Sequence, residues 1–535
     1  MCRHFYHHLP PYDIRQLVMF TILLTLVSTS LFALCFPEGP LPLVVFVCLV
    51  PFAVALYRAG AGTGLFLGFV YGFVGWMIAA WWLANGFYYS VTLTWPAAWI
   101  WTVAGCMVAA LPYALFGLLC GFFGWMAAPF GRLKAAAALT VLTSWYPVLF
   151  PGNHVHALYA FPRLIQAVDL GGVPLLLFAV NLINFSVAGA VLDGAEHRNP
   201  AKNVLTALAV LFFLVTYGTY RLSELHQKMS TAGKERFTSV VSIQPDLPPS
   251  RKGVPQIFGG TETSNSLETA LALSKEAVNR FPAAQAVIWP ELPTVISCDP
   301  ADETLQKVRQ LARESGIPFI VNCNEDDPET GWYYNTARII LETGECGPGY
   351  RKQILLPFGE YLPGERRFPW IRRLFPDTFY YVPGKDVATL SIGGHWLIIP
   401  TLCYEVLFPG LVRDRVRQGG QLIVNQVDDV WFGESDASAV HMALAVFRAA
   451  EFRVPLIRVT NSGNGVFVQP TGEIVTGSRT PVFQARITSF PLFIPAGRSP
   501  YAAVGDAFLI LLTLAWSGET LRTFIRSGSG KKKTV

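Results

Sequence analysis

Apolar residues are concentrated in the first 220 positions of the chain, in runs long enough to cross a lipid bilayer. About 20 consecutive apolar residues span a hydrocarbon core that is roughly 30 Å thick. By this criterion we predict about eight membrane spans, near residues 17–35, 41–57, 62–84, 95–127, 134–149, 171–192, 203–220 and 502–517. The first run lacks the pattern of a cleaved signal, because no small-x-small site follows it and a second apolar run begins almost at once.

A different pattern begins at Phe237, where short β-rich runs alternate with amphipathic helices. This alternation is typical of a layered α/β domain. The predicted strands are 238–245, 286–291, 317–325, 395–405, 422–429 and 456–463, and the predicted helices are 263–281, 302–315 and 441–452. We therefore divide the chain into a membrane bundle at 1–220, an α/β catalytic domain at 221–501, and a C-terminal span with a basic tail at 502–535.

Composition and charge agree with a membrane location. Hydrophobic residues make up 52% of the chain and charged residues only 14%, whereas a soluble domain is about 25% charged. If the N-terminus is cytoplasmic, the eight spans put nearly all basic connecting residues on the cytoplasmic side, as the positive-inside rule requires. These residues are Arg3, Arg15, Arg58, Arg132, Lys134, Arg198, Lys202, Arg522, Arg526 and Lys531 to Lys533. Residues 221–501 then lie on the opposite side, and the small net charge of +5 gives no indication of nucleic-acid binding.

The nine cysteines show neither a CxxC pair nor a metal-ligand spacing, so we expect no zinc site. Four of them lie in apolar runs, where cysteine is typically a small buried residue. Cys298, Cys323 and Cys346 could form a disulfide in an oxidising compartment, and the sequence leaves open which pair forms it, if any. No dinucleotide fingerprint or P-loop occurs either, so we expect no cofactor.

Three segments place polar residues where a strand leaves the core: IWPELP with Glu291, YRKQILLPFGEYLP with Lys352 and Glu360, and TLCYEVLFP with Cys403 and Glu405. A thiol attacks only after deprotonation, so it needs a base or a nearby positive charge. We predict that Cys403 is the nucleophile, that Glu291 is its base and that Lys352 stabilises the oxyanion. Glu360 is expected to hold Lys352 in place or to relay a proton.

Each of these residues alone has an ordinary structural explanation. Cys403 suits a buried core position, Glu291 a turn between two prolines, and Lys352 a solvated surface. Their joint occurrence is harder to explain in that way, because strand ends are where α/β sheets carry their active sites. The three segments together therefore favour an acyl-transfer site.

The same segments resemble the nitrilase superfamily, whose members use a Glu-Lys-Cys triad in an αββα sandwich for amide or acyl transfer. The matching motifs supply the triad and its supporting residues Glu360, Tyr404 and Glu405. With a multispan bundle in front and one span behind, the whole chain is similar to the bacterial apolipoprotein N-acyltransferases. Further matches lie at Gln244, Asn335, Trp431 to Ser435, His441, Arg448 and Asn461.

Two regions depart from the family pattern. Gly253 lies in a neighbourhood where the family usually carries a tryptophan, and the loop with His154, His156 and Tyr159 replaces an LGYSQ-type sequence. Both regions border the substrate entrance in the family. The preference for donor head group, acyl chain and acceptor is therefore less firmly predicted than the triad.

The resemblance implies an enzyme of lipoprotein biosynthesis in the bacterial inner membrane, with its catalytic domain on the periplasmic side. It would transfer an acyl chain from a glycerophospholipid, through a Cys thioester, to the α-amine of the diacylglyceryl-cysteine of an apolipoprotein. It would act without a cofactor and as a monomer. The alternatives are a membrane-tethered nitrilase-like amidohydrolase with the same triad, and a transporter or binding protein that has lost catalysis; the scarcity of charges within the spans disfavours the latter.

Overall fold

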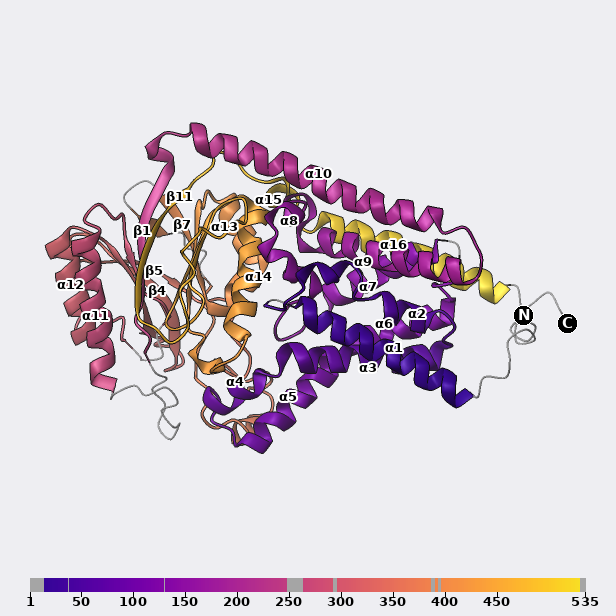
Figure 1. The fold of residues 1–535 in the computed structure, drawn as a ribbon. Helices are drawn as coiled ribbons and strands as arrows, with labels where there is room; N and C mark the ends of the chain where they lie inside the picture. Colours follow the sequence, from indigo (N-terminus) through magenta and orange to yellow (C-terminus); the bar gives the residue numbers. More distant parts are fainter. Residues whose placement is uncertain are drawn as a thin grey trace.

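The computed structural model describes residues 14–36, 38–128, 130–247, 263–291, 296–385, 390–392 and 396–529. These residues form a helical bundle and an α/β part with two sheets, which lie next to each other along the long direction of the molecule (Figure 1). The region around Gly253, Arg3 and the tail Lys531 to Lys533 fall outside the described residues.

Helices that share an apolar composition make up the bundle. They are α1 (Ile14–Cys35), α2 (Val50–Leu56), α3 (Ala61–Ala80), α4 (Leu83–Tyr89), α5 (Trp95–Ala109), α6 (Leu111–Phe123), α7 (Gly131–Trp145), α8 (Pro162–Ile165), α9 (Val168–Ala195), α10 (Ala201–Thr231) and α16 (Ala507–Ser529). Six apolar segments within the described residues are long enough to cross a membrane, and α5 and α6 together form one of them.

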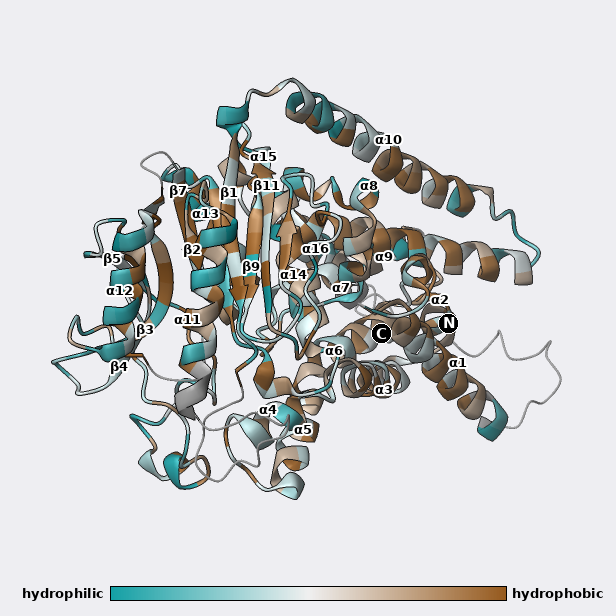
Figure 2. Ribbon diagram, turned by 60° about the vertical axis from the view of Figure 1, so that its left-hand side comes forward, coloured by the Kyte–Doolittle hydropathy of each residue, from teal (hydrophilic) through white to brown (hydrophobic). Residues whose placement is uncertain are grey.

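The two remaining predicted spans, 41–57 and 134–149, correspond to shorter helices. Residues 42–56 divide into a turn of 3-10 helix (Pro42–Phe46) and α2, whereas α7 has 15 residues. At 1.5 Å per residue α7 is roughly 22 Å long, which is less than the thickness of the hydrocarbon core. In contrast, α10 continues 11 residues beyond the predicted end at 220, and Figure 2 shows that its end nearest β1 is hydrophilic.

Glycines allow α3 and α6 to pack with their backbones almost touching. A Cβ atom on Gly64 would lie 2.1 Å from the carbonyl oxygen of Gly117, and one on Gly68 would lie 2.1 Å from that of Tyr113. Small residues at one-turn spacing permit this close approach between membrane helices. Larger side chains at these positions would force the two helices apart.

The α/β part contains two sheets of mixed direction. The first has the order β11-β1-β2-β3-β4-β5 and consists of β1 (Phe237–Gln244), β2 (Val287–Ile288), β3 (Phe319–Asp326), β4 (Tyr333–Ile340), β5 (Cys346–Arg351) and β11 (Arg486–Phe493). The second has the order β10-β9-β8-β7-β6 and consists of β6 (Leu390–Ile392), β7 (Trp396–Leu402), β8 (Leu422–Val427), β9 (Leu456–Thr460) and β10 (Val466–Val468). In each sheet the three central strands are parallel, so that their carboxyl ends meet at one edge.

The sheets pack face to face and each carries helices on its outer side, which gives the predicted αββα sandwich. An apolar layer that includes Ile288, Ile320, Ile398 and Val424 fills the space between the sheets. The helices α11 (Thr263–Arg280) and α12 (Glu303–Ser315) cover the first sheet. The helices α13 (Pro409–Arg417) and α14 (Ala437–Phe452) cover the second, and α14 lies between that sheet and the bundle (Figure 1).

A buried ionic cluster joins the sandwich to the bundle. Arg453, which follows α14, donates two hydrogen bonds to the Asp169 carboxylate of α9 at 3.1 and 2.8 Å, and Arg221 of α10 donates a third at 2.9 Å. Nearby, α9 is interrupted at Gly171 and Gly172, and Glu451 of α14 accepts a hydrogen bond from the freed backbone N–H of Val173 at 3.1 Å. The consecutive helices α9 and α10 are thereby held against the end of α14, which comes from a distant part of the sequence.

The structure differs from the predicted strands in specific places. The predicted strand 286–291 is only two residues long as β2, because the prolines around Glu291 interrupt the ladder. The sequence pattern did not predict five of the strands, namely β4, β5, β6, β10 and β11. Of the three cysteines left open, Cys298 and Cys323 form a disulfide and Cys346 is free.

Candidate active site

Cys403 lies at the point where β7 turns into a short 3-10 helix (Cys403–Leu407). Its backbone has a φ of +48°, in the left-handed region that residues other than glycine seldom adopt. The side-chain amide of Asn425, on the neighbouring strand β8, donates a hydrogen bond to the Cys403 carbonyl oxygen at 3.2 Å. Such a turn persists only when its surroundings hold it, and Cys403 lines the main pocket among the described residues.

Lys352 follows directly after β5 and lies between two carboxylates. Its Nζ atom is 3.3 Å from Oε1 of Glu291 and 2.8 Å from Oε1 of Glu360. The side chain is only 2% exposed, so the ammonium group depends on these two partners. The structure thus brings Glu291 into direct contact with Lys352, and Lys352 into contact with Glu360, from two separate segments of the chain.

Two asparagines complete this cluster. The Asn335 side-chain amide donates hydrogen bonds to Oε1 of Glu291 at 2.7 Å and to Oε1 of Glu360 at 3.2 Å. Asn322 in turn donates to the Asn335 side-chain oxygen at 2.6 Å. Because both asparagines lie on the adjacent strands β3 and β4, the sheet itself fixes the orientation of the Glu291 carboxylate.

Glu405 connects the lysine segment to the cysteine segment. One carboxylate oxygen accepts hydrogen bonds from the Tyr350 hydroxyl at 2.7 Å and from the two backbone N–H groups that follow Lys352, at 2.6 and 3.1 Å. The other oxygen accepts from the backbone N–H of Leu402 at 2.8 Å. Burial raises the pKa of Glu405, and these donors counteract that effect. Glu405 therefore links the end of β5 to the end of β7 through hydrogen bonds.

Electrostatic forces inside the cluster oppose one another. Burial lowers the pKa of Lys352, but the nearby Glu291 and Glu360 carboxylates outweigh it and hold that pKa well above its usual range. Burial raises the pKa of Cys403, the negative charge of Glu291 raises it further, and Lys352 lowers it in part. The net result is a protonated lysine beside a protonated thiol, so a reaction at this thiol would require a base.

The pocket that contains these groups extends from the sandwich to the bundle. It encloses about 1100 Å³, counting the space open to solvent, and its lining includes Glu291, Lys352, Glu360 and Cys403. Much of the remaining lining is apolar and includes Phe87, Val91, Leu149 and Phe150 from the bundle, and Phe358, Phe379, Trp431 and Phe432 from the α/β part. The polar cluster and these apolar residues therefore share one pocket.

The short helix α4 is one of the bundle segments that reach this pocket. The Asn85 side chain donates a hydrogen bond to the carbonyl oxygen of Phe432 at 2.8 Å. The Tyr404 hydroxyl donates to the carbonyl oxygen of Leu149 at 2.7 Å, next to the pocket-lining Phe150. Both contacts tie the bundle directly to the segments that carry the pocket.

Comparison with known proteins agrees with this geometry. The N-terminal domain of apolipoprotein N-acyltransferase matches residues 28–186, and carbon-nitrogen hydrolase matches residues 253–488. Along nearly its whole length the chain is therefore similar to the apolipoprotein N-acyltransferases. The family member from Geobacter metallireducens is 28% identical over 91% of this chain and 92% of its own length. The first such protein of Treponema denticola is 22% identical over 93% of this chain and 96% of its own length.

Solved structures of similar proteins cover about half of the chain. A mutant amidase from Nesterenkonia sp. AN1, described with acrylamide added at its active-site cysteine, is 22% identical and has a TM-score of 0.36. It covers 51% of this chain and 98% of its own length.

The sequence pattern indicated Glu291, Lys352 and Cys403 as candidate site residues, but not all of their surroundings. Asn335 was noted only as a motif match, and Asn322 was not singled out, although both hold Glu291 in place. The sequence pattern also gives no indication of α4, because it places residues 83–89 at the end of a predicted span and in the loop that follows. A signal for Asn322 does exist: it is a polar residue inside an otherwise apolar strand.

The loop with His154, His156 and Tyr159, which departs from the family pattern, packs against other parts of the protein. His154 and His156 are buried in a 3-10 helix (His154–Ala160), and the His156 ring packs against Phe447 of α14. Tyr159 donates a hydrogen bond to the Glu38 carboxylate at 2.7 Å. These residues support α14 in the structure, and they are absent from the lining of the main pocket.

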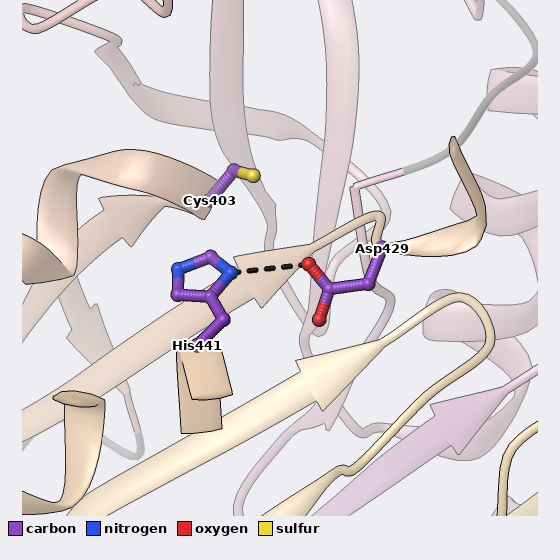
Figure 3. Close-up of side chains that lie close together, drawn as sticks. All are labelled: Cys403, Asp429 and His441. Atoms are coloured by element: carbon purple, nitrogen blue, oxygen red, sulfur yellow. Dashed lines mark hydrogen bonds and ion pairs between the residues drawn. The ribbon is translucent and has the colours of Figure 1, made fainter. Parts of the chain in front are cut away.

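A second group of polar side chains lies on the other side of the Cys403 sulfur. Figure 3 shows Cys403, Asp429 and His441 together, with a hydrogen-bond contact of 3.0 Å between Nδ1 of His441 and Oδ1 of Asp429. The sulfur, a carboxylate oxygen and a ring nitrogen all lie within 4.8 Å of one another. Sequence reasoning noted His441 as a motif match without a role.

Proposed function

We propose that this chain transfers an acyl chain from a membrane glycerophospholipid, through a thioester on Cys403, to the α-amine of the N-terminal diacylglyceryl-cysteine of apolipoproteins. The observation that carries this proposal is the single pocket shared by the Glu-Lys-Cys group and the apolar residues of the bundle. A lipid ester needs both parts, because its acyl chain requires apolar contacts while its carbonyl group must reach the nucleophile. The similar proteins from Geobacter metallireducens and Treponema denticola are both named apolipoprotein N-acyltransferases, which supports this assignment.

In the first half-reaction Glu291 accepts the proton of the Cys403 thiol as the sulfur attacks the ester carbonyl. The resulting oxyanion is stabilised by the Lys352 ammonium and by the backbone N–H that follows Cys403. The carbon–oxygen bond of the ester then breaks, and Glu291 returns the proton to the departing lysophospholipid. The acyl group is left on the sulfur as a thioester.

In the second half-reaction the amine of the acceptor attacks the thioester carbonyl. Glu291 takes a proton from the amine, the carbon–sulfur bond breaks, and the thiol of Cys403 is restored. An apolar cleft favours this order, because it excludes water while admitting a lipid-linked amine. Glu360 and Asn335 keep Lys352 and Glu291 in position throughout.

The proposal also includes a location and a division of the chain. Residues 1–220 and 502–535 would belong to the membrane, and residues 221–501 would form the catalytic part on the periplasmic side of the inner membrane. The distribution of basic residues supports this orientation. A monomer is sufficient for the reaction, because one chain supplies every group named above.

The test uses the full chain in vesicles that contain phospholipid with a radiolabelled acyl chain. The wild type should acquire a covalent, hydroxylamine-sensitive label and pass it to a diacylglyceryl-cysteine peptide. Cys403→Ala should acquire no label, whereas Cys346→Ala, which replaces a cysteine outside the pocket, should be labelled like the wild type. A labelled Cys403→Ala protein would refute the assignment of the nucleophile.

The same experiment distinguishes the proposed acyl transfer from the alternative of an amidohydrolase. Release of labelled free fatty acid, without a labelled peptide, would show that water rather than an amine accepts the acyl group. A labelled peptide in molar excess over the enzyme would show repeated transfer. Either product is resolved by thin-layer chromatography.

A further inference from the structure

His441 and Asp429 lie beside the Cys403 sulfur without taking part in the reaction described above. Both are buried and absent from the pocket lining, and His441 comes from the helix α14. The Asp429 carboxylate also forms an ion pair with Arg458, which is fully buried on β9. Arg458 in turn donates a hydrogen bond to the Asn425 side-chain oxygen at 3.0 Å.

These contacts form a chain that starts and ends at Cys403. Asn425 donates to the Cys403 carbonyl oxygen, Arg458 bridges Asn425 and Asp429, and Asp429 contacts His441, whose ring lies near the sulfur. The backbone of Cys403 is in the left-handed region, which persists only when its surroundings hold it there. The network therefore fixes both the backbone and the side chain of the nucleophile.

The protonation of the pair follows from its contacts. Burial raises the pKa of Asp429, but Arg458 and His441 outweigh it and hold that pKa at about 2, so the carboxylate is ionised and can only accept hydrogen bonds. Burial, together with the charge of Arg458, lowers the pKa of His441, which leaves a neutral ring with one proton. That proton must be on Nδ1, the nitrogen that faces Asp429.

A metal ion fits this group less well, although cysteine, aspartate and histidine are all metal ligands. A histidine that binds a metal through one nitrogen nearly always donates the N–H of the other to a partner. Nε2 of His441 is buried and has no hydrogen-bond partner among the described residues. Arg458 also already neutralises Asp429, so an added cation would face a buried positive charge.

We propose that His441 and Asp429 are positioning residues for Cys403: the Nδ1 side of the imidazole fixes the direction of the sulfur, and the fixed negative charge of Asp429 keeps the proton on it until Glu291 removes that proton. This inference rests on Cys403 being the nucleophile of the proposed function. The charged groups around the sulfur, on which its titration depends, are Glu291, Lys352, Glu360, Asp428, Asp429 and Arg458.

The first experiment measures thiol chemistry without the reaction. The rate of Cys403 alkylation by iodoacetamide is followed from pH 6 to pH 10 by mass spectrometry of the full chain in detergent. Removing a negative charge within 4–6 Å lowers a thiol pKa by about one unit or more. In Asp429→Asn the alkylation profile should therefore shift to lower pH by about one unit, which makes alkylation about tenfold faster below the midpoint. An unshifted profile would overturn the electrostatic part of the proposal.

The second experiment uses two amides that mimic different nitrogens of the ring. Asparagine places its NH₂ group near the position of Nδ1, and glutamine places it near that of Nε2. His441→Asn should therefore keep thioester formation within about tenfold of the wild type, whereas His441→Gln should slow it by roughly 100-fold. The KM for phospholipid should stay unchanged in both, because His441 does not line the pocket.

Each outcome is informative. Equal rates in the two variants, or a changed KM with an unchanged maximal rate, would contradict the positioning role. His226→Gln, which alters an exposed histidine on α10, serves as the control for alkylation and should reproduce the wild-type profile. If the wild type forms no thioester at all, the proposed function fails, while the alkylation experiment still tests the effect of Asp429 on the thiol.

Discussion

The helices α12 and α14 cover opposite sheets of the same sandwich, but their surroundings differ. On α12 the residues Leu305, Val308, Leu311 and Ala312 are buried against the first sheet, while the charged residues on the other face are in contact with water. On α14 all 16 residues are buried, because the second sheet lies on one side and the bundle on the other. Each polar side chain on a fully buried helix such as α14 needs a partner inside the protein, because water cannot reach it.

The difference explains where functional and structural polar groups occur. The polar residues of α12 form exposed pairs such as Glu303 with Lys307. On α14, His441 contacts Asp429 near Cys403, whereas Glu451 accepts a hydrogen bond from α9 at the junction with the bundle and pairs with Arg448 on its own helix. A polar residue on α14 is therefore costly unless it has a partner inside the protein. Changes on α14 should accordingly have larger effects than matched changes on α12.

The largest effect is expected from the ionic cluster behind α14. Asp169→Asn leaves Arg453 and Arg221 without their shared carboxylate, and breaking a buried pair costs about 3–5 kcal/mol. The apparent Tm in detergent should fall by about 10 °C. In Glu303→Gln on α12, where the ion pair is exposed, the Tm should stay within about 2 °C of the wild type. Similar losses in both variants would contradict the comparison.

Packing on the inner helix should give the next largest effect. Ala450 is fully buried, and its Cβ atom lies close to Gly472, which in turn adjoins Ile165. Ala450→Leu overpacks this contact at a cost of about 1–3 kcal/mol, so differential scanning fluorimetry should show a Tm lower by about 6 °C. Gln310→Leu adds an apolar side chain on the exposed face of α12 and should leave the Tm nearly unchanged.

The pH dependence of stability distinguishes the two helices in a different way. Burial raises the pKa of Glu451 from its ordinary value of 4.5 to about 7, so the fold favours the protonated form. Its stabilising contribution is complete below about pH 4.5 and is lost as the pH rises through about 7. Between pH 5 and pH 8 the Tm of the wild type should therefore fall by about 4 °C more than that of Glu451→Gln.

The control for this experiment is again Glu303→Gln on α12. Glu303 is exposed, so its removal should leave the difference in Tm between pH 5 and pH 8 as it is in the wild type. A wild-type Tm that rises over this range relative to Glu451→Gln would show that the carboxyl is stabilised in its charged form.

The smallest expected effect concerns the first turns of the two helices. Asp302 caps α12 by accepting a hydrogen bond from the backbone N–H of Leu305 at 2.9 Å, and Asp302→Ala should cost about 1 kcal/mol, or about 3 °C in Tm. Asp436 stands at the corresponding position of α14 and makes no such side-chain bond. Asp436→Ala should therefore change the Tm by less than about 1 °C, and an equal loss would indicate that the cap is not the cause.

The sequence pattern predicted well those elements whose surroundings are simple. The charged and apolar faces of 302–315 predicted a helix, and the structure has it as α12. The long apolar runs predicted membrane helices, and six of them have the required length. The hairpin strands β4 and β5 escaped prediction, because their alternation of polar and apolar residues is interrupted by glycines and charged residues. The predicted helix 441–452 begins earlier, at Ala437, because its uniformly buried residues give no periodic signal.

The candidate site shows the same division. Glu291, Lys352 and Cys403 were recognisable because a carboxylate, an amine and a thiol at strand ends are unusual in residue type and position. Asn322, Asp429 and the helix α4 were not recognised as parts of the site, because their roles depend on neighbours hundreds of residues away or on adjacent strands.

The sequence by itself thus determined the apolar spans, the α/β repeat and the reactive residue types, since each follows from local periodicity and side-chain chemistry. Only the tertiary structure decided which groups meet. The docking of α14 between the sheet and the bundle places His441 beside Cys403, and α4 closes the pocket through a contact between Asn85 and Phe432. Such contacts arise from surfaces that fit together after both parts have folded, and no short stretch of sequence encodes that fit.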